Sequence, residues 1–372
     1  MIILGIETSC DETAAAILKQ KNGCIQILSN VVASSASLQA KYGGIIPEQA
    51  AREQIKAIIP VIEEALIQSN LYLPSSKHHL PSSTIHPPVI DAIAVTYGPG
   101  LIGSLLVGVE TAKTLATIWN KPLIPINHLL GHFYANWIEI ESRVKNLESR
   151  NKKSRLSTLA TSHSPQFPCL GLLVSGGHTD LVLFRDHGRY DYLGGTRDDA
   201  AGECFDKCAR LLGLPYPGGS ALSKLAFQGV SLEFNLPRPM IDSKDFDFSF
   251  SGLKTAVANL LHTSEVGFDS SEVNDLAASI EAAIVDVLVA KTIKAAETYH
   301  VNQIMIAGGV AANQELVRKL KVQSKKLKIK LHIPPAYLCT DNGAMIASAA
   351  FFTKPVKNPL PVQAEPNIAL SP

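Results

Sequence analysis

Residues 2–18 read Ile-Ile-Leu-Gly-Ile-Glu-Thr-Ser-Cys-Asp-Glu-Thr-Ala-Ala-Ala-Ile-Leu, and this stretch decides the expected fold. The apolar run 2–6 is typical of a buried strand, and the polar residues 8–13 that follow it predict a tight turn. A second apolar run over 14–18 predicts another strand. The stretch therefore predicts a strand–turn–strand unit.

The same unit recurs in the second half of the chain. Residues 169–174 and 181–184 are apolar runs, and Ser-Gly-Gly-His-Thr lies between them at 175–179. Each half also has a later apolar run that leads into a glycine-rich loop and then a helix, at 91–104 and at 303–313. The repetition predicts an α/β fold of two duplicated lobes with a cleft between them. Long helices are expected over 47–69, 105–119 and 274–299.

Two further stretches are expected to be insertions. Residues 70–88 are rich in Ser, Pro and His, which predicts a loop, and residues 141–166 are polar and basic, which predicts a surface segment or linker. We therefore expect a first lobe over 1–133 and a second over 168–352, with the last helix packing back on the first lobe. Residues 353–372 have repeated Pro and no periodicity, so an irregular tail is expected.

Length and composition bound the class of protein. The 372 residues are enough for two domains and a large core, and 46% hydrophobic with 18% charged residues is ordinary for a globular protein. The net charge of +1 gives no overall attraction to nucleic acid or membrane, so any such contact must come from a local patch. The N-terminus has no secretory or transit pattern, and the six cysteines form no Cys-x-x-Cys pair. We expect a cytoplasmic protein with no membrane segment.

Glycine-rich turns predict a nucleotide site. They lie at 98–100, 175–177, 194–195, 217–219 and 308–309. Such turns expose backbone N–H groups that bind phosphate, although each one taken alone is also ordinary turn chemistry. Their number and their position at strand ends favour a nucleotide cleft. The P-loop motif does not occur, which disfavours P-loop enzymes.

The segment His128-Leu-Leu-Gly-His132 contains a candidate pair of metal ligands. Residues four apart lie on one face of a helix, so both imidazoles can reach one ion. A zinc protease has a Glu directly after the first His as general base, and here Leu129 takes that place. Peptide hydrolysis by that route is therefore disfavoured. A buried histidine pair at a helix end, without metal, remains the alternative.

Nine motifs occur in order and together resemble the TsaD family of bacterial tRNA N6-adenosine threonylcarbamoyltransferases, relatives of the catalytic subunit of the KEOPS complex. They are Gly5-Ile-Glu-Thr-Ser-Cys-Asp-Glu-Thr13, Gly98-Pro-Gly-Leu-Ile-Gly-Ser104, His128-Leu-Leu-Gly-His132, Leu173-Val-Ser-Gly-Gly-His178, Phe205-Asp-Lys207, Tyr216-Pro-Gly-Gly219, Phe248-Ser-Phe-Ser-Gly-Leu-Lys-Thr255, Gly308-Gly-Val-Ala-Ala-Asn313 and Cys339-Thr-Asp-Asn-Gly-Ala344. The resemblance spans residues 1 to about 350 except the two insertions. Ser223 stands where some relatives carry an acid.

The resemblance implies the two-lobed fold shared by actin, Hsp70 chaperones and sugar kinases (the ASKHA fold). It implies that the threonylcarbamoyl group of threonylcarbamoyl-AMP passes to N6 of the adenosine 3′-adjacent to the anticodon, in tRNAs that read codons beginning with A. The product is N6-threonylcarbamoyladenosine (t6A). It also implies a TsaB-like paralogue and a TsaE-like ATPase as partners.

The resemblance also assigns site residues. His128, His132 and Asp341 are implied as ligands of one divalent metal per subunit, Fe(II) by resemblance, with Zn(II) also compatible with this donor set. Asp341 could instead cap the following helix. Asp11 and Glu12 are candidates for a different reason: their place in the turn that faces the expected cleft would let either assist proton removal, and the alternative is that they bind a partner or cap a turn. The implied substrate-binding positions are Leu173, Val174, Ser175, Gly176, Gly177, Asp206, Gly219 and Asn313. For Asp206, a salt bridge to Lys207 or Arg210 is the alternative.

A cluster of basic residues is the candidate tRNA contact, with a solvated helix face as the alternative. It comprises Arg318, Lys319, Lys321, Lys325, Lys326, Lys328 and Lys330, with no acid among residues 318–330. Three rival functions remain open from the residues alone: a metallopeptidase, an ATPase or sugar kinase of the same fold, and a non-catalytic paralogue. The last would lack the histidine pair.

Overall fold

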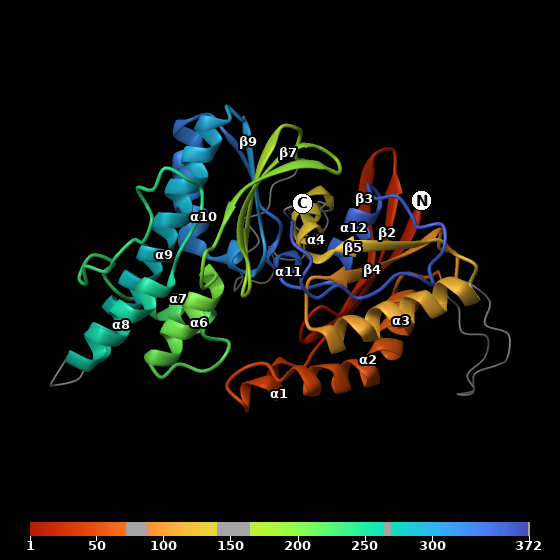
Figure 1. Ribbon diagram of the computed structural model, residues 1–372, viewed down its shortest axis with the longest axis horizontal. Helices are drawn as coiled ribbons and strands as arrows, with labels where there is room; N and C mark the ends of the chain where they lie inside the picture. The colour runs from red at the N-terminus through yellow and green to blue at the C-terminus, as the bar shows by residue number, and fades with distance from the viewer. Residues whose placement is uncertain (72–87, 140–163, 264–268, 371–372) are drawn as a thin grey trace, which may run out of the picture. The chain divides into compact units, whose positions relative to one another are not determined.

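The computed structural model describes residues 1–71, 88–139, 164–263 and 269–370 (Figure 1). Most of the two expected insertions, 70–88 and 141–166, lies outside these residues. No helix in the described part of the chain is long and apolar enough to cross a membrane.

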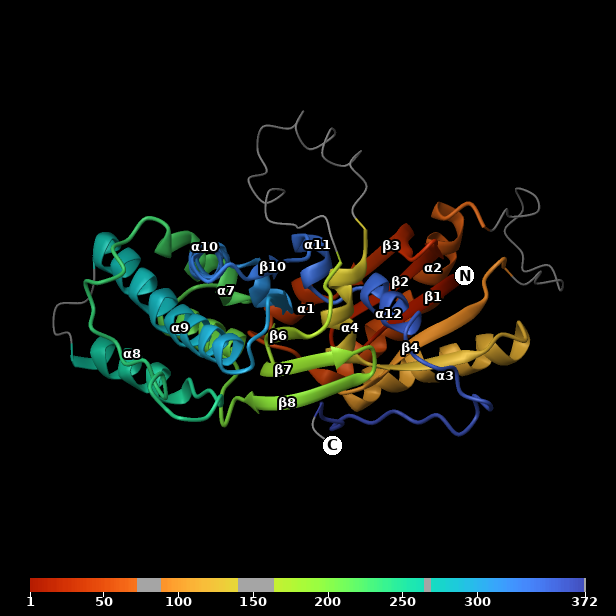
Figure 2. The same ribbon diagram turned by 90° about the horizontal axis from the view of Figure 1, so that it is seen from above.

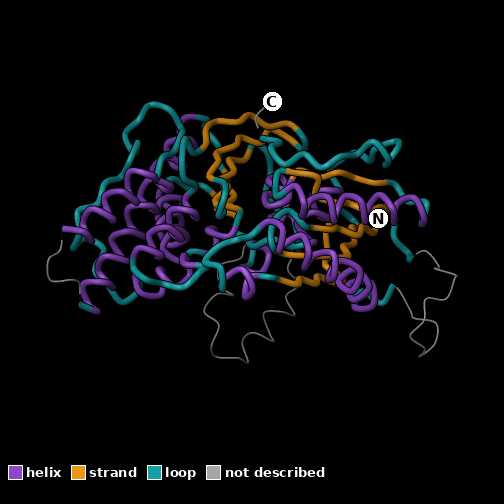
Figure 3. Tube along the Cα trace, turned by 60° about the horizontal axis from the view of Figure 1, so that its bottom comes forward, coloured by secondary structure: helices purple, strands orange, loops and turns teal. Residues whose placement is uncertain are grey.

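The chain divides into two compact units with the same sheet topology. Described residues up to 139 and Thr340–Pro372 belong to the first unit, and Pro165–Cys339 form the second. The strand order is β3-β2-β1-β4-β5 in the first unit and, read from the other end, β8-β7-β6-β9-β10 in the second. In each unit the first three strands are antiparallel neighbours, and the last two run parallel to the first. The predicted duplication of an α/β lobe is confirmed, and Figure 3 shows a strand cluster with helices in each unit.

The first sheet is built from the stretch that opened the sequence. Its strands are β1 (Ile2–Glu7), β2 (Glu12–Lys21), β3 (Cys24–Ser34), β4 (Ala92–Gly98) and β5 (Leu123–Asn127). Side chains alternate between the two faces of β1. Leu4 and Ile6 join a core with residues of α2 (Pro47–Gln68) and α3 (Ile102–Ile118). On the other face, a side chain at Gly5 would overlap the carbonyl group of Gly343, at the start of α12 (Gly343–Ala350).

Helices therefore cover both faces of the first sheet, with α2 and α3 on one face and α12 on the other (Figure 1). The remaining helices of this unit are α1 (Ala36–Ala40), α4 (His128–Tyr134) and the short η1 (Ala135–Trp137). The polar turn predicted over 8–13 is shorter in the structure, because Glu12 and Thr13 already pair with β3 as part of β2.

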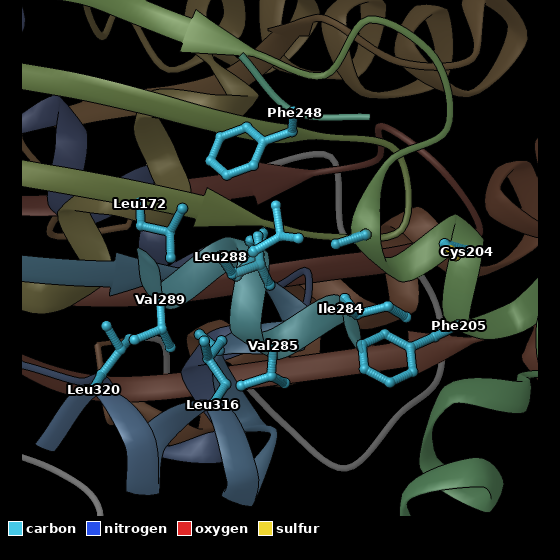
Figure 4. Close-up of a cluster of buried hydrophobic side chains, with 14 of the residues drawn as sticks. Leu172, Cys204, Phe205, Phe248, Ile284, Val285, Leu288, Val289, Leu316 and Leu320 are labelled. Atoms are coloured by element: carbon cyan, nitrogen blue, oxygen red, sulfur yellow. The ribbon is translucent and has the colours of Figure 1, made fainter. Parts of the chain in front are cut away.

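The second sheet contains β6 (Cys169–Val174), β7 (Thr179–Asp186), β8 (Arg189–Gly195), β9 (Gln303–Ala307) and β10 (Lys330–His332). Figure 2 shows β6, β7 and β8 side by side. The helices are α6 (Ala201–Leu211), α7 (Gly218–Ala226), α8 (Ser251–Thr263), α9 (Ser270–Thr298), η3 (Gly309–Ala312), α10 (Gln314–Lys326) and α11 (Ala336–Cys339). Ile284, Val285 and Leu288 of α9 lie at the centre of the core of this unit (Figure 4).

The three long helices expected from the sequence are present as α2, α3 and α9. The third begins at Ser270 rather than residue 274, because Asp269 caps it. The Asp269 carboxylate accepts from the N–H groups of Ser271 and Glu272, and the Glu272 carboxylate accepts from the N–H of Asp269. This capping box could have been read from the Asp-x-x-Glu spacing.

The C-terminal segment has no helix or strand in its described part, residues 353–370, yet it packs on the first unit. The N–H of Val356 donates to the carbonyl of Leu123, and that of Glu365 donates to the carbonyl of Tyr97 in β4. Val356 also packs against the core of that unit. Figure 2 shows this dark blue segment leaving the end of α12.

Candidate metal centre and substrate site

Two histidines lie one turn apart on α4, the short helix that follows β5. The side-chain oxygen of Asn127 accepts hydrogen bonds from the N–H groups of Leu129 (2.9 Å) and Leu130 (3.4 Å). This cap starts the helix at His128. The rings of His128 and His132 are both buried, with centroids 4.7 Å apart and planes at 79°. Helix spacing thus places both imidazoles on one face, as the sequence predicted.

Asp341 joins the two histidines. Its Oδ1 lies 3.2 Å from Nε2 of His132 and 3.6 Å from Nε2 of His128. One ligand atom from each residue lies within 4.8 Å of the other two, a spacing that one ion can bridge. Gly131 allows α12 to approach α4, because a Cβ there would come within 2.7 Å of the Ile346 side chain.

Asp341 does not cap α12. The cap is Asn342, whose side-chain oxygen accepts from the N–H of Met345 (2.9 Å). The alternative that we considered for Asp341 is therefore wrong. The helix begins one residue later than that alternative requires, so the neighbouring amide takes the capping role.

Glu7, at the end of β1, is a buried carboxylate that contacts the first histidine. Its Oε2 lies 3.1 Å from Nδ1 of His128, and the Ser9 hydroxyl lies 3.2 Å from the same nitrogen. Burial disfavours the charged ring, but the charges of Glu7 and Asp341 outweigh that effect and raise the pKa of His128 to about 9. A carboxylate on Nδ1 fixes the ring so that Nε2 points to the other ligands. Sequence reasoning did not find Glu7.

The surroundings of His132 show whether this group of residues fits a metal. The side chain is 2% exposed and Nδ1 has no hydrogen bond within the described chain, while Nε2 lies 3.2 Å from the Asp341 carboxylate without the geometry of a hydrogen bond. An unsatisfied buried polar group costs about 1–3 kcal/mol. Coordination of Nε2 to a cation would remove part of that cost. Two imidazoles and one carboxylate are ordinary ligands for Fe(II) or Zn(II), so the residues fit a divalent metal.

The turn between β1 and β2 carries two more acids. Burial and the charges of Asp341 and Asp11 raise the pKa of Glu12 to about 9. The Ser34 hydroxyl donates to Glu12 over 3.3 Å, which opposes that rise only weakly. Burial and the same acidic neighbours also raise the pKa of the Cys10 thiol, so it is not a thiolate at neutral pH. Asp11 and Glu12 therefore lie in the same electrostatic environment as the metal-ligand group.

The predicted substrate-binding positions all lie in the second unit. Leu173 and Val174 are fully buried in β6, so they can offer a ligand backbone groups only. The Ser175 hydroxyl accepts from the N–H of His178 (3.1 Å), which closes the turn before β7. Gly176 and Gly177 are exposed at its tip, and a Cβ on either would have no atom of the described residues within 4 Å. The tip therefore presents open backbone.

Asp206 organises the start of α7. Its Oδ1 accepts from the N–H groups of Gly218 and Gly219, each at 2.8 Å. Burial raises the pKa of Asp206 in spite of these bonds. Lys207 pairs with Asp199 (2.7 Å) instead, so the salt bridge that we considered between Lys207 and Asp206 is wrong.

Asn313 has its side chain fully engaged within the second unit. Its oxygen caps α10 by accepting from the N–H of Leu316 (2.8 Å). Its amide nitrogen donates to Glu281 (2.7 Å) and to the Ser223 hydroxyl (3.1 Å). Glu281, whose pKa is raised by burial, was not identified from the sequence. Its helical position between apolar residues gave no signal for this contact.

Comparison with known proteins decides the family. A family model described as "TsaD: tRNA N6-adenosine threonylcarbamoyltransferase" matches residues 26–147 and 153–348. A Thermomicrobium roseum protein of the same description is 46% identical, over 95% of this chain and 92% of its own length. A Listeria welshimeri protein of that description is 48% identical, over 94% and 90%. The chain belongs to the TsaD family.

TsaD membership confirms the activity predicted from the sequence, formation of t6A on tRNA by threonylcarbamoyl transfer. The peptidase and kinase rivals are therefore set aside. Among solved structures, T. kodakarensis HypF aligns with a TM-score of 0.54 over 94% of this chain and 47% of its own length, at 14% identity. That likeness concerns the fold alone.

The basic cluster predicted to contact tRNA is smaller in this TsaD protein than its sequence suggested. Arg318 makes two 2.7 Å bonds to Glu315, and Lys319 pairs with Asp286 (2.5 Å). Glu315 lies just before the window in which we found no acid, and Asp286 reaches Lys319 from α9. The lysines that remain exposed are Lys321, Lys325, Lys326, Lys328 and Lys330.

Proposed function

We propose that this chain transfers the threonylcarbamoyl group of threonylcarbamoyl-AMP to N6 of the adenosine 3′-adjacent to the anticodon, in tRNAs that read codons beginning with A. We propose that it does so with one divalent metal held by His128, His132 and Asp341. The metal assignment rests on the convergence of these three side chains, whose ligand atoms lie within 4.8 Å of one another. Neither ring nitrogen of His132 has a hydrogen bond among the described residues. Fe(II) is the first candidate by resemblance, and Zn(II) is the second.

A metal in this group would act as a Lewis acid that orients and polarises the carbamoyl donor. The protein's own contribution is to hold the ligands. Glu7 and Ser9 fix the ring of His128 from its Nδ1 side. Transfer to a weakly nucleophilic amine depends on positioning, which is worth about 7–11 kcal/mol when donor and acceptor are well oriented.

Asp11 and Glu12 are the proposed acceptors of the proton that leaves N6. Because the raised pKa of Glu12 comes from burial and neighbouring negative charge, positive charge near Asp341 would lower it. Glu12 would then be ionised closer to neutral pH and able to take a proton.

The donor's phosphate is proposed to bind at the open turn 175–177. Gly176 and Gly177 place no side chain between a ligand and the backbone N–H groups. Asp206 already accepts from the N–H groups of Gly218 and Gly219 at the first turn of α7, so its carboxylate is proposed to accept hydrogen bonds from the ribose hydroxyls of the donor. Leu173 and Val174 are proposed to contact the donor through their backbone groups. Asn313 is proposed to contribute to the donor site by fixing the start of α10, which it caps.

A TsaB-like paralogue is proposed to bind the outer face of α2 and α3. This surface exposes Ile55 (64%), Ile59 (48%), Ile102 (50%) and Leu106 (44%). An apolar stripe on two adjacent helices is typical of a protein interface. The proposal of a TsaE-like ATPase as a second partner rests on family resemblance.

The exposed lysines of residues 321–330 are proposed to contact tRNA phosphates. A cytoplasmic location agrees with the free cysteines.

The test is a reconstituted assay with purified chain, threonylcarbamoyl-AMP, tRNA and the two partners. Nucleosides are measured by mass spectrometry, and metal by elemental analysis. The wild-type chain is expected to form t6A, and the His128→Ala, His132→Ala double variant to lose metal and activity while remaining folded. His262→Ala, at an exposed position of α8, is the matched control. Full activity in the metal-free double variant would refute the metal assignment.

A further inference from the structure

The backbone of the turn between β1 and β2 is fixed from outside the turn at every residue. The carbonyl of Ser9 accepts from the N–H of Leu101 (2.8 Å), and that of Asp11 accepts from both the N–H and the hydroxyl of Ser35 (3.1 and 3.0 Å). The carbonyl of Cys10 accepts from the Ser104 hydroxyl (3.0 Å). The remaining carbonyls in 8–12 depend on a single side chain.

That side chain is Gln54 of α2. Its Nε2 lies 3.3 Å from the carbonyl oxygen of Thr8, 3.0 Å from that of Cys10 and 2.9 Å from that of Glu12. The two amide hydrogens are shared among three acceptors, so the peptide groups on alternate residues all point toward one nitrogen. No other side chain in the described chain bonds to the carbonyls of Thr8 and Glu12.

The position of Gln54 is otherwise suited to an apolar residue. It is 1% exposed, on the face of α2 where Ala50, Ile58 and Val61 are buried. Burying an amide is unfavourable unless it is hydrogen-bonded, and Oε1 of Gln54 has no partner within the described residues. An aliphatic side chain would avoid that cost. The polar group at this site therefore has one evident task, which is to donate to the turn.

The turn that Gln54 holds carries the groups beside the metal ligands. Ser9 contacts Nδ1 of His128 at 3.2 Å, and Glu12 lies close enough to Asp341 for that charge to raise its pKa. Rotation of the peptide groups at 8, 10 or 12 would redirect the side chains of Ser9, Asp11 and Glu12. The orientation of these three side chains thus depends on the amide of Gln54 together with the bonds from Leu101, Ser104 and Ser35.

We propose that Gln54 is a positioning residue for threonylcarbamoyl transfer. It acts through the backbone of residues 8–12, and it touches neither substrate nor metal. The inference rests on the proposed roles of Asp11 and Glu12. An amide is needed because a neutral double donor is the group that can serve three carbonyl oxygens at once.

The first test compares Gln54→Met, which keeps the length but has no donor, with Gln68→Met at an exposed position of the same helix. Gln54→Met is expected to reduce kcat by about tenfold to a hundredfold, as a small misplacement of reacting groups does, with the KM for tRNA nearly unchanged. Gln68→Met is expected to match the wild-type chain. Hydrogen exchange of the peptide covering residues 8–12 is expected to rise in Gln54→Met alone, and this readout does not depend on activity.

The second test is the pH profile of Gln54→Glu, which also serves if Gln54→Met fails to fold. A protonated Glu can donate to one carbonyl, whereas a carboxylate repels all three, so kcat relative to the wild-type chain is expected to fall as pH rises. A role in packing alone predicts a ratio that does not change with pH. The proposal is overturned by a flat ratio, or by faster exchange at 8–12 with kcat unchanged. Absence of product from the wild-type chain would instead refute the proposed function.

Discussion

The turns that follow β1 and β6 occupy the same place in the two copies of the fold, yet their chemistry is opposite. Residues 8–11 after β1 are polar and largely buried, with each carbonyl bonded from outside the turn. Residues 175–178 after β6 are closed locally by Ser175, and Gly176 and Gly177 are exposed at the tip. A buried turn can hold carboxylates beside a metal site when its backbone is anchored. An exposed glycine turn offers backbone N–H groups instead.

The largest effect is expected beside the buried turn after β1, where the metal ligands lie. Asp341→Ala leaves two imidazoles without the carboxylate that lies 3.2 Å from His132. Metal content is expected to fall to background and t6A formation to drop at least ~100-fold, since the remaining ligands bind a divalent ion weakly. Elemental analysis and the mass-spectrometric assay measure both. Glu233→Ala, at an exposed position, is the control. Retained metal in Asp341→Ala would exclude this carboxylate as a ligand.

A smaller effect is expected from the residue that orients the first histidine. Glu7→Gln keeps the shape of the side chain but removes the charge 3.1 Å from Nδ1 of His128. Metal affinity is expected to weaken about 10- to 100-fold, as for other partners of ligating histidines. Competition with a chelator of known affinity measures the change. An unchanged affinity would mean that Glu7 has only a packing role.

Substitution of one glycine in each copy of the fold is expected to affect different properties, stability in the first copy and donor binding in the second. Gly5→Ala in β1 would collide with the Gly343 carbonyl, so a loss of about 1–3 kcal/mol in unfolding free energy is expected. A Cβ at position 176 would have no atom of the described residues within 4 Å, so the unfolding free energy of Gly176→Val should change by less than about 0.5 kcal/mol. The KM for threonylcarbamoyl-AMP should nevertheless rise about tenfold, because the Val side chain would stand between the phosphate and the backbone N–H groups and weaken a charged hydrogen bond. Denaturant unfolding and steady-state kinetics test the pair, and a normal KM in Gly176→Val would remove the donor from this turn.

The smallest effect expected is a difference between the two units in how their stability depends on pH, in the chain without metal. The pKa of His128 rises from 6.5 to about 9, so its stabilisation is complete below 6.5 and lost as pH rises through about 9. The raised pKa of Glu12 acts in the same direction, because ionising it in the fold is unfavourable. Hydrogen bonds from Ser249 and Ser251 outweigh burial and lower the pKa of Asp198 to about 2, so its stabilisation is lost as pH falls from 3.8 toward 2.

Hydrogen exchange resolved by peptide separates the two units. Exchange in β2 is expected to rise at alkaline pH, and exchange at the start of α8 to rise at acid pH, after correction for the intrinsic pH dependence of exchange. Bound metal should suppress the first effect and leave the second unchanged. The same pH response in both regions would contradict the assignment of these groups.

The elements that follow from local pattern could be predicted from the sequence. The apolar runs of β1 and β6, their turns and the long helices are set by periodicity and turn residues, and the spacing of His128 and His132 fixes their common face. The nine ordered motifs gave the family. Boundaries that depend on one residue could not be fixed, as the capping of α12 by Asn342 instead of Asp341 shows.

Contacts made across the sheet could not be predicted either. Glu7 reaches His128 because β1 and β5 both lie next to β4, which no local pattern reveals. In the sequence, Gln54 is one more polar residue of an amphipathic helix. Its hydrogen bonds to the turn carbonyls are seen only in the folded structure, where α2 brings Gln54 to residues 8–12. Likewise Asp286 of α9 pairs with Lys319 of α10, which a search for acids along α10 alone misses.

His128, His132 and Asp341 are proposed to bind one divalent metal. Crystals grown with Fe(II) or Zn(II), with diffraction collected across the absorption edge of that metal, test it directly. We predict one anomalous peak per chain, within roughly 2.0–2.2 Å of Nε2 of both histidines and of a carboxylate oxygen of Asp341. A loaded, active protein with no peak at these three side chains would contradict the account.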